Sequence, residues 1–186
     1  MKSKRNIILV ILILIGIFSL ILASTYFYLK EYAGKDKTVK ISVIVYGSSS
    51  GRWDTLLQGV DQACLNFGSE VNFVSMMSVK DAEEQKILLD REIANGADGI
   101  IIAVTDSELM TQEVREASGK IPLVVVETGI SDTEGITFVS ADNYSMGLNL
   151  ARSIPMLQSK KTIAVIMENV NRSSINERYQ GFLDYI

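Results

Sequence analysis

The sequence contains no histidine and only one cysteine among its 186 residues. Without histidine, the chain cannot form a Ser-His-Asp catalytic triad or supply the imidazole ligands that many zinc sites use. The single cysteine, Cys64, excludes a disulfide within the chain and a metal cluster held by several cysteines. Because Cys64 falls on the apolar face of a predicted helix, we interpret it as a buried structural thiol rather than a reactive one. We therefore expect neither a metal nor another cofactor.

An excess of positive charge and a phosphate-binding loop are also lacking. Lys and Arg number 18 against 22 Asp and Glu, which gives a net charge of −4 and a pI of about 5.0. Such a chain has no basic field to attract nucleic acid. Residues 47–51 are small, but they have neither the GxGxxG pattern nor the Lys-Ser/Thr ending of phosphate-binding loops. An enzyme that uses Asp106 or Glu127 as a base is the less favoured alternative to a binding protein.

The sequence does have a long apolar run near its N-terminus. Residues 7–29 carry no charge and would form a helix of about 35 Å, long enough to cross a bilayer. The run is longer than the core of a usual signal peptide and lacks a clear cleavage site, so we predict an uncleaved signal anchor, with a cleaved signal peptide as the alternative. The positive charges of Lys2, Lys4 and Arg5 predict a cytoplasmic N-terminus and an extracytoplasmic body. A membrane span in place of a helix-turn-helix disfavours a transcriptional regulator.

After a polar linker at residues 30–38, apolar runs of strand length alternate with amphipathic segments of helix length. This alternation predicts βαβ units and a parallel α/β sheet. The predicted strands lie at residues 40–46, 70–76, 100–104, 123–126, 136–140 and 162–167. The predicted helices lie at residues 53–67, 81–95, 107–118 and 142–157, with a last helix that follows a polar loop at 168–174 and still continues at Ile186. Asp81 and Asp142 are predicted N-caps, and either Asp106 or Ser107 caps the third helix.

The first predicted strand and helix meet at a joint of small residues. Arg52 and Trp53 stand where the loop at residues 47–51 becomes the helix. The apolar residues of this helix recur at three- or four-residue spacing and form one stripe, at positions 53, 56, 57, 60, 64 and 67. A joint at the carboxyl end of a parallel strand is where open α/β sheets bind small ligands. We therefore predict a small-molecule site here.

Five phrases of the sequence, taken in order, resemble the type I periplasmic-binding-protein family. They are Ile-Ser-Val-Ile-Val at 41–45, Asn-Gly-Ala-Asp-Gly-Ile-Ile-Ile-Ala at 95–103, Ile-Pro-Leu-Val-Val-Val-Glu at 121–127, Val-Ser-Ala-Asp-Asn-Tyr-Ser-Met-Gly at 139–147 and Asn-Glu-Arg-Tyr-Gln-Gly-Phe at 176–182. The family includes the sugar receptors of ribose-, xylose- and galactose-type transport systems and is related to the effector domains of lactose-repressor-like regulators. The resemblance implies two Rossmann-like lobes, joined by a hinge, that close over a ligand.

This resemblance suggests a division of the chain into three parts. Residues 1–38 form the membrane anchor or signal and its linker, residues 39–140 form the first lobe, and residues 141–186 begin the second lobe. Because the second lobe has only its opening elements, we expect it to be incomplete, as in a truncated gene product or a fragment.

The resemblance also implies that the first loop supplies an aromatic wall for a sugar. Trp53 matches a stacking position, with Arg52 beside it and Ser50 in the loop; the Arg-Trp pair is similar to that of xylose- and multiple-sugar-type receptors. An indole plane suits the apolar face of a pyranose, and a guanidinium suits its hydroxyls. Two alternatives stay open: Trp53 simply begins the apolar stripe of the helix, and Arg52 is a solvated surface charge.

Four further ligand-binding residues follow from the resemblance, namely Asp81, Glu127, Asp142 and Arg178. Glu127 stands where the family usually has Asp followed by Arg, and Thr128 comes next, so one arginine clamp is missing. A carboxylate at the end of a buried strand needs polar partners, which favours a ligand contact for Glu127. Asp81 and Asp142 have the alternative role of helix caps, and Arg178 that of an exposed ion-pair partner.

The resemblance implies a membrane-anchored extracytoplasmic protein that binds a monosaccharide or a similar small polar ligand. Its partner would be the permease of an ABC-type carbohydrate importer. The alternative is a ligand-sensing subunit for a membrane sensor kinase of a two-component system. In both cases the protein is expected to bind its ligand without transforming it.

Overall fold

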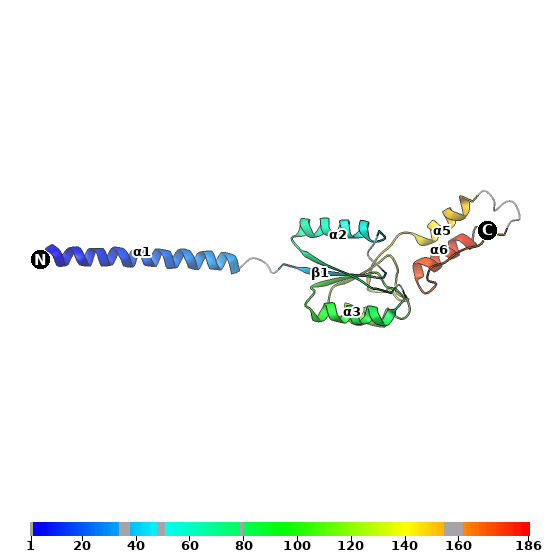
Figure 1. Ribbon diagram of the computed structural model, residues 1–186, viewed down its shortest axis with the longest axis horizontal. Helices are drawn as coiled ribbons and strands as arrows, with labels where there is room; N and C mark the ends of the chain where they lie inside the picture. The colour runs from blue at the N-terminus through cyan, green and yellow to red at the C-terminus, as the bar shows by residue number, and fades with distance from the viewer. Residues whose placement is uncertain (1, 34–37, 48–50, 79, 155–161) are drawn as a thin grey trace. The chain divides into compact units, whose positions relative to one another are not determined.

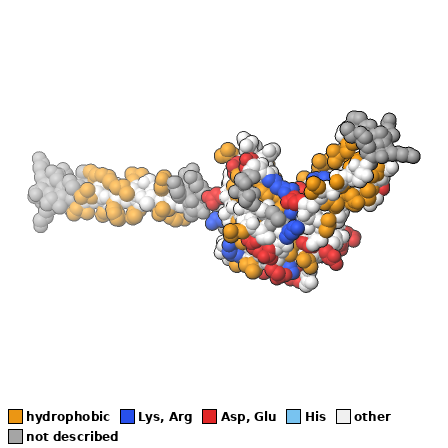
Figure 2. Space-filling model, turned by 45° about the vertical axis from the view of Figure 1, so that its right-hand side comes forward, with side chains coloured by type: hydrophobic (Ala, Val, Ile, Leu, Met, Phe, Trp, Pro, Cys, Tyr) orange, Lys and Arg blue, Asp and Glu red, His pale blue; other side chains and the backbone are white. Residues whose placement is uncertain are grey.

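The computed structural model describes residues 2–33, 38–47, 51–78, 80–154 and 162–186. The chain divides into two compact units, Met1–Lys37 and Thr38–Ile186. The first unit is one helix, α1 (Lys2–Ala33), and its stretch Ile11–Lys30 is long and apolar enough to cross a membrane. Exposed hydrophobic side chains line the described stretch Ile11–Lys30 of this helix (Figure 2). The predicted apolar run at residues 7–29 is therefore helical, and its insertion in a membrane stays a prediction.

The second unit is built on one sheet of five parallel strands in the order β2-β1-β3-β4-β5. The strands are β1 (Lys40–Val45), β2 (Glu70–Ser75), β3 (Gly99–Ile102), β4 (Leu123–Val126) and β5 (Thr137–Val139). The strands β1, β3 and β4 are rich in aliphatic residues, as expected for the central strands of a sheet that has both faces covered. The predicted parallel α/β fold is confirmed.

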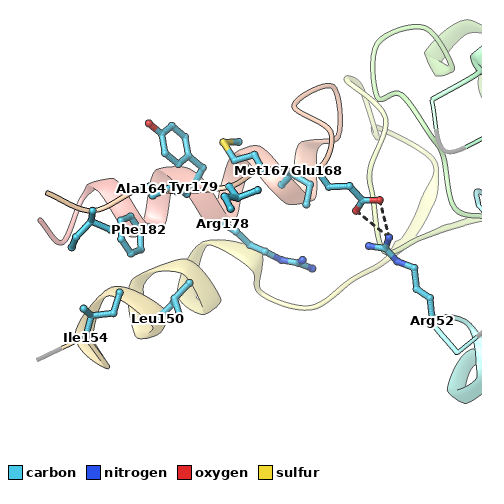
Figure 3. A pocket seen from close by; sticks show the side chains of 13 residues that line it. Arg52, Leu150, Ile154, Ala164, Met167, Glu168, Arg178, Tyr179 and Phe182 are labelled. Atoms are coloured by element: carbon cyan, nitrogen blue, oxygen red, sulfur yellow. Dashed lines mark hydrogen bonds and ion pairs between the residues drawn. The ribbon is translucent and has the colours of Figure 1, made fainter. Parts of the chain in front are cut away.

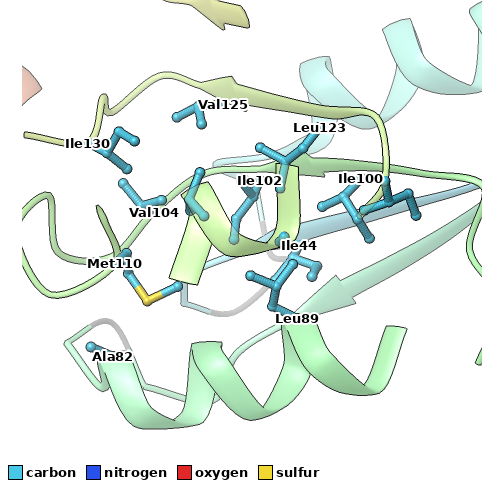
Figure 4. Packing of buried hydrophobic residues seen from close by; sticks show 13 residues of the cluster. Ile44, Ala82, Leu89, Ile100, Ile102, Val104, Met110, Leu123, Val125 and Ile130 are labelled. Atoms are coloured by element: carbon cyan, nitrogen blue, oxygen red, sulfur yellow. The ribbon is translucent and has the colours of Figure 1, made fainter. Parts of the chain in front are cut away.

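Helices cover both faces of the sheet (Figure 1). The helices of this part are α2 (Asp54–Phe67), α3 (Ala82–Ala94) and α4 (Thr111–Ser118). Successive side chains of a strand point to opposite faces. Thus Val43 of β1 packs in the cluster of α2, with Val60, while the neighbouring Ile44 packs in the cluster of α3 and α4, with Leu89 (Figure 4). Cys64 packs half-buried against the cluster on the α2 side.

Two buried polar side chains join α3 to the sheet. Gln85 is fully buried; its amide donates to the carbonyl of Ala103 and accepts from the backbone N–H of Thr105, both at 2.8 Å. Glu92 accepts hydrogen bonds from Ser42 at 2.9 Å and from Asn72 at 2.6 Å. Because buried polar groups are costly unless they are paired, these bonds fix the register of α3 against the strands and hold the loop that follows β3.

The helices α5 (Asn143–Arg152) and α6 (Ser173–Leu183) pack with almost no space between their backbones. A Cβ atom added to Gly147 would lie 1.8 Å from the carbonyl oxygen of Arg178, and one added to Gly181 would lie 2.1 Å from the carbonyl oxygen of Tyr144. Only glycine permits this approach, because any other residue would place its Cβ inside the facing helix.

The structure corrects several predicted boundaries. Residues 162–167 form no strand, although the sequence predicts one; a strand needs a neighbour for its backbone hydrogen bonds, and no described strand pairs with this segment. The helix α4 begins at Thr111 rather than at 107, because the Asp106 carboxylate accepts from the N–H groups of Glu108 and Leu109 and holds a separate turn.

The last two helices also end earlier than predicted. The helix α6 ends at Leu183 instead of continuing at Ile186, and α5 ends at Arg152. Residues 155–157 of the predicted fourth helix lie outside the described residues. Asp81 and Asp142 are the N-caps of α3 and α5, as predicted. The division of Thr38–Ile186 into two lobes, with a boundary between residues 140 and 141, stays a prediction.

Candidate functional site

Polar side chains gather where β1, β3 and β4 end, and residues 168–178 lie against them. The amide of Asn169 donates to the carbonyl of Thr105 at 3.0 Å, and the N–H of Ser107 donates to the carbonyl of Asn171 at 2.9 Å. The N–H of Ser173 donates to the Ser107 hydroxyl at 2.9 Å. The carboxyl edge of the sheet and the start of α6 are therefore joined by hydrogen bonds.

The centre of this region is the carboxylate of Glu127. It accepts a hydrogen bond of 2.7 Å from the Tyr46 hydroxyl, one from Thr128 and one of 3.4 Å from Ser174, and its Oε1 lies 3.8 Å from Nη2 of Arg178. Glu127 has a φ of 65°, a left-handed conformation that is strained for a residue with a side chain. The strand β4 and these partners hold the carboxylate in one place while part of it reaches solvent.

Tyr46 joins this carboxylate to a buried cation. The guanidinium carbon of Arg172 lies 3.7 Å from the centroid of the Tyr46 ring, and both side chains are fully buried. A guanidinium over an aromatic face is stabilised by the negative charge of the ring face. Burial raises the pKa of the Tyr46 phenol above its usual value, and the adjacent Glu127 carboxylate raises it further. The hydroxyl therefore stays protonated and donates to Glu127.

Arg52 and Arg172 share one carboxylate, that of Glu168. Figure 3 shows the contact between Arg52 and Glu168. Nη1 of Arg52 lies 3.2 and 3.0 Å from the two oxygens of Glu168, and Nη1 of Arg172 lies 3.3 Å from one of them. Partial burial acts to raise the pKa of Glu168, but the hydrogen bond from Arg52 and the charges of Arg172 and Arg52 outweigh it and lower this pKa. Glu168 is therefore ionised at neutral pH.

These side chains form one connected group, here named the Glu127 cluster. Its members are Tyr46, Arg52, Glu127, Glu168, Arg172 and Arg178. A cavity of about 460 Å³ begins at Arg52, Glu168 and Arg178 and continues along apolar residues of α5, α6 and segment 163–167 (Figure 3). A second hollow, of about 720 Å³, is lined by residues that follow β3 and by residues of the 170–177 segment, among them Asp106, Ser107 and Glu177.

Trp53 lies beside this cluster but points into the core. Its side chain is 5% exposed, its Nε1 donates to the carbonyl of Tyr46 at 2.9 Å, and its ring meets that of Tyr46 edge-on at 5.1 Å between centroids. This position fits the alternative that Trp53 begins the apolar stripe of α2. The guanidinium carbon of Arg52 lies 5.9 Å from the Trp53 ring centroid and 5.2 Å from that of Tyr46. Stacking of a sugar on Trp53 stays a prediction.

The other predicted site residues have separate places. The carboxylate of Asp81 accepts from the N–H of Glu84 at 3.0 Å, and that of Asp142 accepts from the N–H of Ser145 at 2.8 Å, so the described bonds of both carboxylates cap their own helices. The Nε of Arg178 donates to the side-chain oxygen of Asn143 at 2.8 Å. Asn143 thereby orients Arg178 toward Glu127. Ser50 lies outside the described residues.

Three of the predicted site residues, Arg52, Glu127 and Arg178, thus lie in one cluster in the structure. The sequence alone does not single out the other three members, Tyr46, Glu168 and Arg172. Glu168 and Arg172 stand four residues apart in the polar loop before α6, a spacing that was available as a signal for a local ion pair. Nothing in the sequence places the guanidinium of Arg172 on the ring of Tyr46, because this contact joins residues 126 positions apart. Among the described residues, no group of His, Cys, Asp and Glu side chains could hold a metal ion.

Comparison with known proteins identifies the family. A family model described as a periplasmic binding protein domain matches residues 41–186. The chain belongs to this family. Its parallel sheet is thus that of a periplasmic binding protein domain. A comparison with curated protein sequences gives no match.

Solved structures of sugar-binding proteins share the fold. The sugar-binding protein of an ABC transporter from Bacillus halodurans is 26% identical, with a TM-score of 0.68 over 78% of this chain and 50% of that one. The fructose-binding periplasmic domain of a hybrid two-component system is also 26% identical, with a TM-score of 0.72 over 80% of this chain and 49% of that one. A carbohydrate transporter solute-binding protein from Agrobacterium radiobacter, in complex with D-arabinose, has a TM-score of 0.72 over 81% of this chain and 53% of that one, at 23% identity. The chain spans about half the length of these proteins.

Proposed function

We propose that this chain is a membrane-anchored, extracytoplasmic solute-binding protein that recognises a monosaccharide or a similar small polar ligand. The observation that carries the proposal is the Glu127 cluster, which offers a partly exposed carboxylate and two partly exposed guanidiniums, those of Arg52 and Arg178, at the carboxyl edge of a parallel sheet. Ligands of open α/β sheets bind at this edge. The sugar-binding relatives at 26% identity support the same ligand class.

In this proposal, Glu127 accepts hydrogen bonds from sugar hydroxyls, and Arg52 and Arg178 donate to the hydroxyl oxygens. Carboxylates and guanidiniums each offer two or more directed hydrogen bonds, which suits neighbouring hydroxyls of a sugar ring. Arg172 and Tyr46 stay buried beneath them and position Glu127 and Glu168. Ser50, Trp53, Asp81 and Asp142 complete the proposed site. We expect binding without chemical transformation of the sugar and without a cofactor.

The proposed location follows from α1. Its apolar stretch Ile11–Lys30 has the length of a membrane span, and positive residues precede it in the sequence. Under the positive-inside rule, the N-terminus then lies in the cytoplasm and the unit Thr38–Ile186 lies outside it. A cysteine-accessibility experiment in a Cys64→Ser background, which removes the native thiol, tests this. Ser3→Cys should resist a membrane-impermeant maleimide in intact cells, and Glu177→Cys should react.

Two partners fit such a protein. A ligand that bridges two lobes favours the closed state and thereby changes the surface offered to a partner. An ABC permease is the first candidate, since relatives include sugar-binding proteins of ABC transporters. A sensor kinase is the second, since the fructose-binding relative belongs to a two-component system. Ligand-dependent cross-linking to a kinase, and never to a permease, would decide for sensing.

The ligand class is tested by thermal unfolding of the full chain in detergent micelles with pentoses, hexoses and sugar acids. At least one sugar should raise the unfolding temperature, and Arg178→Gln should abolish the rise. Arg115→Gln is the matched control, because Arg115 lies on α4, pairs with Asp132, and belongs neither to the cluster nor to the lining of its cavity. A panel in which no sugar changes the unfolding temperature contradicts the proposal.

A further inference from the structure

The last turn of α2 leaves two large apolar side chains in solvent. Leu65 is 79% exposed and Phe67 is 84% exposed. Phe67 continues the stripe of Val60 and Cys64 at helical spacing, and these two residues pack against the sheet. The helix ends at Phe67, and the chain turns at Gly68 into β2. Large apolar side chains that are exposed together mark a contact surface more often than isolated ones do.

These side chains lie at the amino edge of the sheet, where the strands begin. Glu70, the first residue of β2, pairs with Lys40, the first residue of β1, and the N–H of Glu70 donates to the carbonyl of Val39 at 2.8 Å. Val39 is 47% exposed and lines a hollow of about 320 Å³ together with Phe67. The other residues that line this hollow are apolar apart from Ser69. Val39, Leu65 and Phe67 are here named the amino-edge patch.

The amino-edge patch begins directly after the linker that follows α1. The helix α1 ends at Ala33, and six residue steps join Ala33 to Val39. Because an extended chain spans at most about 3.6 Å per step, this connection reaches about 22 Å at most. Residues 30–40 contain four lysines against one glutamate and one aspartate, although the whole chain has a net charge of −4. The patch therefore follows a short basic stretch, a combination that favours an anionic lipid surface.

On the basis of the proposed membrane anchor, we infer that the amino-edge patch inserts into the surface of the bilayer that holds the anchor. Leu65 and Phe67 enter the boundary between head groups and acyl chains, as the apolar residues of interfacial segments do. A strand of six residues such as β1 is about 20 Å long, so the Glu127 cluster at the opposite edge of the sheet stays in water. The contact thus leaves the proposed sugar site open to solvent.

A protein partner fits this patch less well than a lipid surface. A stable interface between two proteins involves about 20–30 residues on each side. The solvent face of α2 before its last turn is polar, with exposed Gln58, Asp61 and Gln62. The exposed apolar surface of α2 is therefore confined to its end. A bilayer accepts a few inserted side chains of this kind without a matching surface.

Fluorescence quenching by lipids tests the inference on the full chain, reconstituted in vesicles of phosphatidylcholine and phosphatidylglycerol. In a Cys64→Ser background, Leu65→Cys carries a nitrobenzoxadiazole label, and a nitroxide at carbon 5 of the acyl chain is the quencher. Met77→Cys is the matched position, because Met77 is 95% exposed and follows β2 at the carboxyl edge. Quenching at position 65 should exceed that at position 77 at least about threefold, since only the inserted label meets acyl chains.

A second substitution shows whether the apolar side chains make the contact. Phe67→Ser in the labelled Leu65→Cys chain should lower the quenching at least about twofold, because it removes the largest apolar side chain of the patch. Ile87→Ser is the control, since Ile87 is 67% exposed on α3 and lies outside the patch. Equal quenching in the two variants would overturn the inference.

Flotation of the vesicles reports the anchor separately. A chain that floats with the vesicles and shows equal quenching at positions 65 and 77 overturns the inference and leaves the proposed function in place. Emission at position 65 that is shifted to the blue without quenching by the labelled lipid would assign the patch to a protein partner, and it too would overturn the inference. A chain that does not float contradicts the proposed anchor itself.

Discussion

The guanidinium carbon of Arg172 lies 3.7 Å from the centroid of the Tyr46 ring, and neither side chain reaches solvent. The same ring carries the hydroxyl that donates to Glu127 at 2.7 Å. Tyr46 thus contacts the buried cation of Arg172 through its ring and the partly exposed anion of Glu127 through its hydroxyl. It thereby fixes the distance between these two charges. Since Tyr46 directly follows β1 and is fully buried, the cluster is anchored to the core of the sheet.

Replacement of Tyr46 separates its two roles. Tyr46→Phe keeps the ring under Arg172 and removes the hydrogen bond to Glu127, so the free energy of unfolding should fall by about 1 kcal/mol. Tyr46→Leu also removes the aromatic face and should cost about 2 kcal/mol more. Urea unfolding of the full chain, followed by circular dichroism, measures both. Tyr179→Phe on the exposed side of α6 is the control, and an unchanged midpoint for Tyr46→Phe would contradict the role of the hydroxyl.

Because α5 and α6 pack closely, replacing a glycine at their contact with alanine should lower the free energy of unfolding. Gly147→Ala and Gly181→Ala each place a Cβ within about 2 Å of a facing carbonyl oxygen, so each should destabilise the chain by about 1–3 kcal/mol. Gly59→Ala, in the middle of α2 with open space around it, should instead stabilise by up to about 1 kcal/mol. Equal effects of all three in thermal unfolding would show that the two helices do not approach in this way.

The ionised state of Glu168 predicts an acid-sensitive contribution to stability. Its pKa is lower in the folded chain than in the unfolded one, so its contribution is complete above the ordinary glutamate pKa of about 4.3 and is lost as pH falls through the lower folded value. The Asp142 pKa is also lowered, mainly by the backbone N–H of Ser145, and acts in the same direction. Unfolding temperatures between pH 6 and pH 3 should therefore fall less for Glu168→Gln than for the wild type. Parallel curves for the two proteins would contradict this assignment.

The local features of the fold could be predicted because their signals are local. Aliphatic runs mark β1, β3 and β4, and Asp81 and Asp142 stand where an N-cap is needed. The strand predicted at residues 162–167 is wrong for the opposite reason, because apolar composition indicates a strand only when another strand is available to pair with it. The environment of a side chain, like the pairing of a strand, depends on residues far away in the sequence and is therefore hard to predict.

In the candidate site, too, the sequence predicts local features but not contacts between distant residues. Its residues at the strand ends, Glu127 above all, could be predicted from the order of elements and the family resemblance. The burial of Trp53 depends on the carbonyl of Tyr46, and the position of Arg172 depends on the Tyr46 ring. Neither contact leaves a pattern in the sequence. Glu168 could be placed in a polar loop, but not between two arginines.

The two possible roles of Asp81 can be separated by substitution. Asp81→Asn keeps an N-cap and should leave the free energy of unfolding nearly unchanged, whereas Asp81→Ala should lower it by about 1 kcal/mol. If Asp81 also contacts the sugar, as proposed, both variants should bind the sugar more weakly. Calorimetric titration beside urea unfolding checks this. Wild-type affinity in Asp81→Asn would leave Asp81 with the role of a cap alone.

The most direct test of sugar binding uses the fluorescence of Trp53, the only tryptophan in the chain. Its indole donates to the carbonyl of Tyr46 and lies next to Arg52, so a ligand that engages the Glu127 cluster changes its surroundings. Titration of the full chain with monosaccharides should change the emission in a saturable way, and Glu127→Gln should weaken the response. Emission that stays constant with every pentose, hexose and sugar acid would contradict the account.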